Sequence, residues 1–590
     1  MMYSFDDRAD LPWPNSILDR GVIIGHTTTN SSRIWVRTGK KGDFTLLVFD
    51  RKKNQLADKF TALRQASKFL TEEDIVPFEN FIHSFSTSDK TDYTTVIEVN
   101  ELKPGTQYTY AVLEKIEANQ FKFILGHDKR RRFSTPFGAE QYAFGLFSCH
   151  QPYTDPKFYA NFFNVMGGRD QPEIKNMDVW KTAQSAFAKK RENAALEFLI
   201  AGGDQAYCDG CNSLNIWKYL EKTIKNHKKN GTRLPNREEM ISWYRNMYKG
   251  YWGFPTLKSI YGQYPTYMIW DDHEIRDGWG SHKLEGADKE INEVLFEKWD
   301  EYIDEKTALI LINDMCEAAK QVYKEYQHSH NPLSDDDNIY DYTFTANASL
   351  FYVLDGRGQR NFDREKYKIL GEAQMKRFHK KVNDLDPQKT KFLFVVSAVP
   401  VIHAKQMLAN NAEGWLADKA NITDDLRDSW EHPIHNDERR ELLDILFAAA
   451  NKGIMVCILS GDVHTTAMFK MERAGKKIHQ LTSSAITYNT PRMLSWALGK
   501  TIADDGESQE DNYKYERLKM LLDPSFAIIK VDTRTGQEKI TFQVYKAQTI
   551  KGNDEENREL SKLERNRGDI LEKEFLISSS IDKSILYKDQ

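Results

Sequence analysis

Hydrophobic and polar positions follow two different patterns along the chain. Between Gly21 and Phe137, short runs rich in β-branched and aromatic residues alternate with turn residues, as in "SRIWVRT", "FTLLVFD" and "YTTVIEVNEL". Short runs of this kind, separated by turns, are typical of antiparallel strands packed as a β-sandwich. We therefore expect an all-β sandwich domain over residues 1–137.

From Gly138 onward, apolar runs of strand length alternate with longer stretches of helical periodicity, which is typical of a domain that layers helices on sheets. This second domain is expected over residues 138–548. Four strand candidates are followed at once by a polar cluster, with the sequences "SCHQ", "GGDQAYCDG", "DDHEIRDGWGS" and "SGDVH". The full set of strand candidates is Tyr142–Phe147, Leu196–Ala201, Tyr267–Trp270, Leu350–Leu354, Phe392–Ala398 and Ile454–Leu459.

Two further segments have apolar residues at helical spacing. Residues 289–328 predict a helical insertion within the second domain, placed to cover the sheet or to frame a pocket. The stretch "EENRELSKLERNRGDILEKEF" is rich in charge and predicts a solvated amphipathic helix. We expect it to form a C-terminal helical tail over residues 549–590.

Composition and charge narrow the class of protein. The chain has 590 residues and a formal net charge of -5, so it lacks the basic field that general nucleic-acid binding requires. The N-terminus has no secretory signal pattern, and no stretch approaches the ~18 apolar residues of a membrane span. We therefore expect a cytoplasmic chain without a transmembrane segment, or a periplasmic or secreted one if a leader was removed. The five cysteines predict no disulfide framework.

The four polar clusters carry the candidate chemistry. Loops at the carboxyl ends of neighbouring strands meet at one crevice, so these clusters are expected to form a single site. So many acidic groups would repel one another and take up protons unless cations compensate them. A pair of bound metal ions removes this conflict. The side chains collected in this way are Cys149, Asp204, Tyr207, Asp271, Asp272, His273, Asp462 and His464.

The donor types divide into two groups. Cys149, Tyr207 and His464 offer a thiolate, a phenolate and an imidazole, which favour a transition metal such as Fe(III) or Zn. Asp272 and Asp462 are hard oxygen donors that suit Ca²⁺, Mg²⁺ or Mn²⁺. A bridging position suits Asp204, because two metals ~3.5–4 Å apart readily share one carboxylate.

Taken together, the four motifs resemble those of the alkaline phosphatase D-like (PhoD-type) branch of the calcineurin-like metallophosphoesterases. "LDGRGQR", "LGEAQMKRF" and "SSAIT" add to the likeness, which covers about Gly138 to Lys546. The resemblance implies an α+β fold, a four-layer α/β/β/α sandwich, preceded by an all-β sandwich domain. In that first domain, "LKPGTQYTYAV" resembles a strand pair of a fibronectin type III or immunoglobulin-like fold.

The resemblance also implies a dinuclear site that pairs Fe(III) with Ca²⁺, with Zn, Mn and Mg as alternatives. The first ion would be held by Cys149, Asp204, Tyr207 and His464, and the second by Asp204, Asp272 and Asp462. His273 stands where the family places its general acid, with Glu274 or Asp271 as the carboxylate that orients it. Arg357 or Arg360 is expected to stabilise a phosphoryl oxygen.

The expected function is hydrolysis of phosphomonoesters, phosphodiesters or both by a hydroxide bound at the two metals. One alternative is a catalytically silent relative that binds a phosphorylated ligand or a protein. Another is a thiol enzyme based on Cys149 and the adjacent His150. Cys208 and Cys211 form a CxxC pair, for which reduced, partly buried thiols are favoured over a zinc or redox site.

Overall fold

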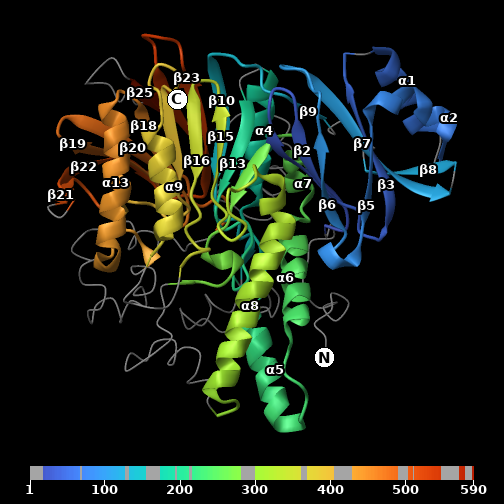
Figure 1. Ribbon diagram of the computed structural model, residues 1–590, viewed down its shortest axis with the longest axis horizontal. Helices are drawn as coiled ribbons and strands as arrows, with labels where there is room; N and C mark the ends of the chain where they lie inside the picture. The colour runs from blue at the N-terminus through green and yellow to red at the C-terminus, as the bar shows by residue number, and fades with distance from the viewer. Residues whose placement is uncertain are drawn as a thin grey trace, which may run out of the picture.

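Helices and β-sheets both contribute to the fold (Figure 1), which confirms the expected combination. The structure is a computed structural model. It describes residues 18–52, 54–66, 69–117, 119–125, 132–154, 173–192, 196–210, 215–280, 299, 301–360, 368–403, 428–488, 502–508, 511–546, 571–578 and 588–589.

The N-terminal strands form two antiparallel sheets that share a core. Ile24 and Val36 of the first sheet and Val48 and Val112 of the second are buried between them. The first sheet contains β1 (Gly21–Thr27), β2 (Ser32–Arg37) and β6 (Thr94–Val99). The second contains β3 (Gly42–Asp50), β4 (Leu70–Thr71), β5 (Ile82–Thr87), β7 (Gln107–Glu117), β8 (Gln120–Leu125) and β9 (Arg132–Ser134).

Two helices that the strand pattern does not predict cover the outer face of the second sheet. They are α1 (Asn54–Ala66) and α2 (Glu72–Ile75). Phe60 of α1 packs against Phe49 of β3, with ring centroids 5.2 Å apart. Successive residues of a strand point to opposite faces, so Phe49 faces α1 while its neighbour Val48 faces the shared core.

Two larger sheets follow, and all six predicted strands are found in them within two residues of their predicted ends. The seven-stranded sheet has the order β14, β13, β10, β23, β24, β25, β26, and the eight-stranded sheet the order β15, β16, β17, β18, β20, β19, β22, β21. Strands β10, β13 and β14 run parallel in the first sheet, and β16, β17 and β18 run parallel in the second. The predicted strands are β10 (Gln141–Phe147), β13 (Leu196–Gly202), β14 (Thr266–Ile269), β16 (Ser349–Val353), β17 (Phe392–Val396) and β18 (Met455–Ser460). The others are β15 (Tyr342–Ala346), β19 (Thr466–Arg473), β20 (Lys476–Thr482), β21 (Gly506–Ser508), β22 (Tyr513–Leu521), β23 (Ser525–Asp532), β24 (Lys539–Lys546), β25 (Leu571–Ser578) and β26 (Lys588–Asp589).

The two larger sheets pack against each other through aromatic side chains. Phe144 of β10 meets Phe351 of β16 and Phe394 of β17 edge to face, with ring centroids 5.2 and 5.4 Å apart. Such edge-to-face pairs favour association beyond the burial of apolar area alone. Because these strands are buried on both faces, they appear in the sequence as continuous apolar runs.

Helices cover the outer faces of both larger sheets. On the eight-stranded sheet, Phe378 of α9 (Gly371–Asn383) packs edge to face on Tyr352 of β16, and Leu446 of α13 (Asn436–Asn451) lies in the same apolar core as Ile458 of β18. On the seven-stranded sheet, α4 (Met177–Glu192) packs on β13, β23 and β24, with α7 (Pro255–Tyr261) beside it.

Three helices extend below the sheets as an arm in Figure 1: α5 (Ile216–Asn230), α6 (Arg237–Trp252) and α8 (Glu305–Tyr326). Helix α8 lies in the expected helical insertion, of which residues 289–298 and 300 fall outside the described part. None of the described helices has an apolar stretch that could cross a bilayer.

The prediction of a C-terminal helical tail is wrong over one segment. Leu571–Ser578 forms strand β25, which pairs antiparallel with β24. The backbone groups at a sheet edge need partners, and that tertiary requirement overrides a helical pattern read from sequence. The remaining tail residues, apart from the short strand β26, lie outside the described part.

A buried ion pair joins the N-terminal sheets to the helical arm. Arg37 of β2 lies 3.0 Å from Asp92, and both side chains are less than a tenth exposed. Tyr326 of α8 donates a hydrogen bond to Asp92, and Nζ of Lys249 in α6 lies 3.5 Å from the same carboxylate. We refer to Arg37, Asp92, Lys249 and Tyr326 as the junction network.

Candidate metal centre

The loops after β10, β13, β14 and β18 meet at one point between the two larger sheets. The backbone N–H of Cys149 donates to the carbonyl of Gly203, and that of His150 donates to the carbonyl of Asp204, at 3.2 and 2.8 Å. Gly461 allows the loop after β18 to approach, because a Cβ there would lie 2.5 Å from Ser148 and 2.6 Å from the Gly202 carbonyl. Segments far apart in sequence are thus held in direct contact.

Four residues of these loops have left-handed backbone conformations. Their φ angles are 56° for Cys149, 57° for Asp204, 63° for Asp462 and 51° for His464. Such angles are uncommon for residues other than glycine, and they gather at functional sites. The loops therefore hold these side chains at the cost of backbone strain.

A first group of donors surrounds one oxygen of Asp204. The Cys149 thiol lies 3.4 Å from Oδ2 of Asp204, and the Tyr207 hydroxyl donates to the same oxygen at 3.1 Å. The Tyr207 oxygen is also 3.2 Å from Nε2 of His464. A thiol, a phenol, an imidazole and a carboxylate are brought together, as the sequence predicts.

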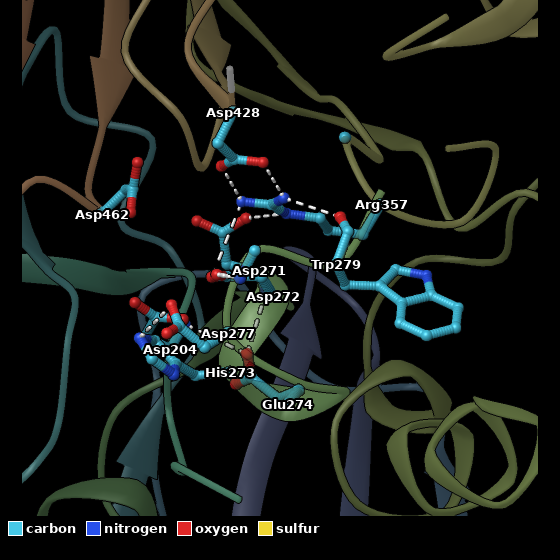
Figure 2. A network of polar contacts seen from close by, with 12 residues as sticks. Asp204, Asp271, Asp272, His273, Glu274, Asp277, Trp279, Arg357, Asp428 and Asp462 are labelled. Atoms are coloured by element: carbon cyan, nitrogen blue, oxygen red, sulfur yellow. Dashed lines mark hydrogen bonds and ion pairs between the residues drawn. The ribbon is translucent and has the colours of Figure 1, made fainter. Parts of the chain in front are cut away.

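A second group contains only carboxylates. One oxygen from each of Asp204, Asp271, Asp272 and Asp462 lies within 4.8 Å of the others (Figure 2). Oδ1 of Asp204, Oδ2 of Asp271 and Oδ1 of Asp272 are buried and have no hydrogen-bond partner among the described residues. Buried polar atoms normally have a partner, so three such oxygens at one place point to a bound cation.

The electrostatics of the cluster agree with that reading. Burial raises the pKa of Asp204 and of Asp462 well above the ordinary range, and it raises the pKa of Asp271 to about 6. Burial also lowers the pKa of His464 to about 3, which keeps its imidazole neutral and able to donate a lone pair. Cations would compensate the carboxylates without protonation.

The residues present fit two metal ions. The thiol, phenol and imidazole suit a transition metal, and the carboxylates suit a harder cation. Asp204 belongs to each of the three candidate ligand groups, which fits the bridging position expected for it.

His273 lies beside the metal-ligand groups and is oriented by a carboxylate that the sequence does not single out. Its Nδ1 is 2.6 Å from Oδ1 of Asp209, whose other oxygen accepts the backbone N–H of Asp277 at 2.6 Å. Burial lowers the pKa of His273, but Asp209, Asp272 and Asp204 outweigh it and raise the pKa well above its ordinary value. Asp209 stands in "GDQAYCDG", and its place in the same loop as Asp204 is a signal that could have identified it.

Glu274, expected to orient His273, has another set of contacts. Its buried carboxylate accepts the backbone N–H groups of Asp204, Gln205 and Asp271, at 3.2, 2.6 and 2.8 Å, and the side-chain N–H of Gln327 at 2.8 Å. Glu274 therefore ties the loops after β13 and β14 to the end of α8. The other expected carboxylate, Asp271, binds Arg357.

Arg357 and Arg360 are both buried against carboxylates. The fork of Arg357 donates to both oxygens of Asp428 at 2.5 Å, and its Nε donates to Asp271 (Figure 2). Arg360 also donates to Asp428, at 2.5 Å. The sequence predicts that one of these arginines contacts a phosphoryl oxygen. In the structure both donate to carboxylates of the chain instead. Asp428 is not among the residues that the sequence predicts.

The neighbouring residues weigh against a thiol enzyme. Both ring nitrogens of His150 have other partners: Nδ1 accepts from Trp180 at 3.1 Å and Nε2 lies 3.0 Å from the Tyr251 carbonyl. Cys149 contacts Asp204 instead, and burial raises the pKa of its thiol well above the ordinary value. His150 therefore does not supply a base that could activate Cys149.

Two further side chains lie near the site. Tyr488, not predicted from sequence, stacks on the His464 ring with centroids 3.5 Å apart. The Cys208 thiol is buried and donates to the Ile275 carbonyl at 3.2 Å, while Cys211 lies outside the described residues. Fold and site together define a protein of mixed α and β structure with a candidate dinuclear metal centre at the ends of its parallel strands.

The model of the PhoD-like phosphatases matches residues 175–537. This match covers more than half of the chain, and the protein belongs to the PhoD-like phosphatase family. An uncharacterized protein of Saccharomyces cerevisiae is 23% identical over 365 residues, which are 52% of this chain and 50% of that protein. The chain thus spans about half the length of this curated relative.

One solved structure shares the fold at low sequence identity. A structure of PhoD superposes with a TM-score of 0.55 and 16% identity, covering 94% of this chain and 98% of that one. A purple acid phosphatase from yellow lupin (Lupinus luteus) seeds superposes with a TM-score of 0.47 and 10% identity, covering 91% and 73%.

Proposed function

We propose that this protein hydrolyses phosphate esters, either monoesters, diesters or both, at a dinuclear metal centre. One observation carries the proposal: a thiol, a phenol, an imidazole and several carboxylates converge on Asp204, beside a histidine oriented by a carboxylate. Membership of the PhoD-like phosphatase family supports the same activity.

In this proposal Cys149, Asp204, Tyr207 and His464 hold one ion, and Asp204, Asp272 and Asp462 hold the other. The donor types favour Fe(III) for the first and Ca²⁺ for the second, with Zn, Mn and Mg as alternatives. The bound ions would act as Lewis acids on the phosphoryl oxygens and supply an activated water as nucleophile.

His273 is proposed as the general acid. Its Nδ1 is held by Asp209, and Nε2, which lies 4.0 Å from Oδ1 of Asp277, would give a proton to the departing alkoxide. Carboxylates around the ring favour the protonated form that an acid needs. Asp209 acts as a positioning residue, because it fixes the ring and the site of protonation without touching the substrate.

We also propose an arrangement of layers and domains for the chain. The contacts of α4 with one large sheet and of α9 and α13 with the other support an α/β/β/α arrangement of the catalytic part. The two sheets before residue 137 support a separate sandwich domain of fibronectin type III or immunoglobulin-like type. The boundaries at residues 137 and 548 stay predictions.

The direct test combines metal analysis with hydrolysis of mono- and bis-p-nitrophenyl phosphate. We expect the purified chain to contain metal, to hydrolyse at least one of the two esters and to lose activity on chelation but not on thiol alkylation. A chain that binds metal and a phosphorylated ligand but hydrolyses neither ester would favour the catalytically silent alternative.

The acid role of His273 has its own test. Replacing His273→Asn should lower kcat roughly 10²–10⁴-fold on an alkyl phosphate, whose leaving group needs a proton. The loss should be much smaller on p-nitrophenyl esters, whose leaving group departs as the anion. His379→Asn, on the exposed side of α9, is the matched control and should change neither rate. Equal losses on both classes of ester would exclude the acid role.

A further inference from the structure

The guanidinium of Arg357 has a carboxylate or carbonyl near each of its nitrogens. Its side chain is 0% exposed. Nη1 and Nη2 each donate to Asp428 at 2.5 Å, Nη1 also donates to the Trp279 carbonyl at 3.1 Å, and Nε donates to Asp271. A paired fork of this kind is among the strongest interactions that arginine makes.

Asp272 forms only a long ion pair with this arginine, with no hydrogen bond between them. Its Oδ2 accepts the backbone N–H of Gly278 at 2.6 Å. Its Oδ1 lies 3.6 Å from Nη2 of Arg357 and is buried without a hydrogen-bond partner among the described residues. That side chain is also in two of the candidate ligand groups, and the proposed second ion needs an oxygen from it.

Arg357 is therefore a potential competitor for a metal ligand. A guanidinium so close to an unpaired carboxylate oxygen would be expected to close the remaining distance and bind it. In this structure both terminal nitrogens donate hydrogen bonds to Asp428, and the contact of Nη2 with Asp272 stays at 3.6 Å (Figure 2). Asp428 is itself held by Arg360, which donates to Oδ1 of its side chain at 2.5 Å and to its carbonyl at 3.1 Å.

We propose that Asp428 is a positioning residue that holds the fork of Arg357 away from Asp272, so that Oδ1 of Asp272 is free to bind the second cation. The inference rests on the proposed dinuclear centre. It gives Arg357 and Asp428 a role in metal binding instead of in contact with the substrate.

The proposal predicts how two substitutions should combine in their effect on metal affinity. In Asp428→Asn the acceptor of the fork loses its charge, so Arg357 turns to Asp272 and competes with the cation. We expect one of two binding steps for Mn²⁺ to weaken by roughly 10–100-fold, the range typical of residues that position metal ligands. Adding Arg357→Met removes the competitor, and the double variant should recover most of the lost affinity.

The experiment uses the full chain, stripped of metal by a chelator and titrated with Mn²⁺ by calorimetry. A parallel titration with Co²⁺ follows the thiolate-to-cobalt absorption band, which reports on Cys149 and should be the same in all variants. Asp511→Asn is the matched control, because it breaks an ion pair of similar burial with Arg439, 2.7 Å apart, in none of the ligand groups.

The outcomes separate the two proposals. Unchanged Mn²⁺ affinity in Asp428→Asn, or equal weakening in Asp511→Asn, would overturn the role of Asp428 alone. A double variant as weak as the single variant would show that Asp428 acts only through the stability of the fold, which thermal unfolding of each variant measures independently. If the unaltered chain binds neither ion, the metal centre itself is overturned, and the role of Asp428 with it.

Discussion

Two buried charge clusters in this protein have opposite electrostatic balance. In the junction network, Asp92 lies against Arg37 and Lys249 and accepts a hydrogen bond from Tyr326. Burial would raise the pKa of Asp92, but Lys249 and Arg37 outweigh it and hold the pKa below its ordinary value. At the metal centre, burial and neighbouring carboxylates raise the pKa of Asp204 and Asp462 instead.

This contrast distinguishes a cluster that stabilises the fold from one arranged to bind a cation. The junction network is neutralised by the chain's own cations, and none of its polar side-chain atoms lacks a partner among the described residues. At the candidate metal centre, three carboxylate oxygens have no hydrogen-bond partner in the described part of the chain. A fold tolerates such an excess of buried negative charge when an external cation completes it.

The largest expected effect comes from Asp204→Asn. Because Asp204 belongs to all three ligand groups, we expect metal affinity to fall more than ~100-fold, beyond the range of residues that only position ligands. Without metal, the Asp204→Asn variant should be no less stable than the unaltered chain, since one repelling carboxylate has been removed. Calorimetric metal titration and thermal unfolding check the two parts. A large loss of stability without metal would mean that Asp204 is structural.

The same chemical change in the junction network should have the reverse outcome. Asp92→Asn leaves Arg37 buried without its counter-charge, which typically costs about 3–5 kcal/mol of stability. Metal affinity should not change, because none of the ligand groups includes Asp92. Urea unfolding measures the loss. Asp437→Asn, in an exposed ion pair with Arg440, is the control and should cost less than about 1 kcal/mol.

Removing metal should destabilise the whole protein by a smaller amount. A ligand at 100 times its Kd stabilises the folded state by about 2.7 kcal/mol, provided that it binds only that state. We therefore expect chelation to lower the Tm of the unaltered chain and of Asp92→Asn by similar amounts. The shift should vanish in Asp204→Asn. An equal shift in all three proteins would place the metal elsewhere.

The smallest effect expected from a single side chain concerns pH and the buried histidines near the N-terminal sheets. Burial lowers the pKa of His330 to about 3 and that of His26 and His328 to about 4. These groups are neutral in the folded state, whereas the unfolded chain binds protons near its ordinary pKa of about 6.5. The stability that these neutral histidines contribute is fully present above about pH 6.5 and is lost as the pH falls toward about 3–4.

The test compares unfolding in urea at about pH 7 and about pH 5. We expect stability to fall by up to ~1.4 kcal/mol per pH unit for each such histidine. His330→Asn should have a shallower pH dependence than the unaltered chain. An identical slope in the variant would show that His330 does not cause the acid sensitivity.

Much of the fold was accessible from sequence because its signals are local. The six core strands appear as apolar runs since they are buried on both faces, and their ends differ from prediction by two residues or fewer. Helix α1 was missed where a helical stretch interrupts a region of strand character. Strand β25 was missed because its pairing with β24 depends on which sheet edge the tail reaches.

Side-chain chemistry and apolar patterning are properties of short segments. The sequence alone therefore specifies which donor atoms are present and that they lie in loops after strands. The tertiary structure decided which groups become partners. Asp209 meets His273 from 64 positions away, and Asp428 meets Arg357 from 71 positions away. Contacts over such separations are set by how the sheets and loops pack, and a neighbouring acidic residue such as Glu274 can point to a different part of the site.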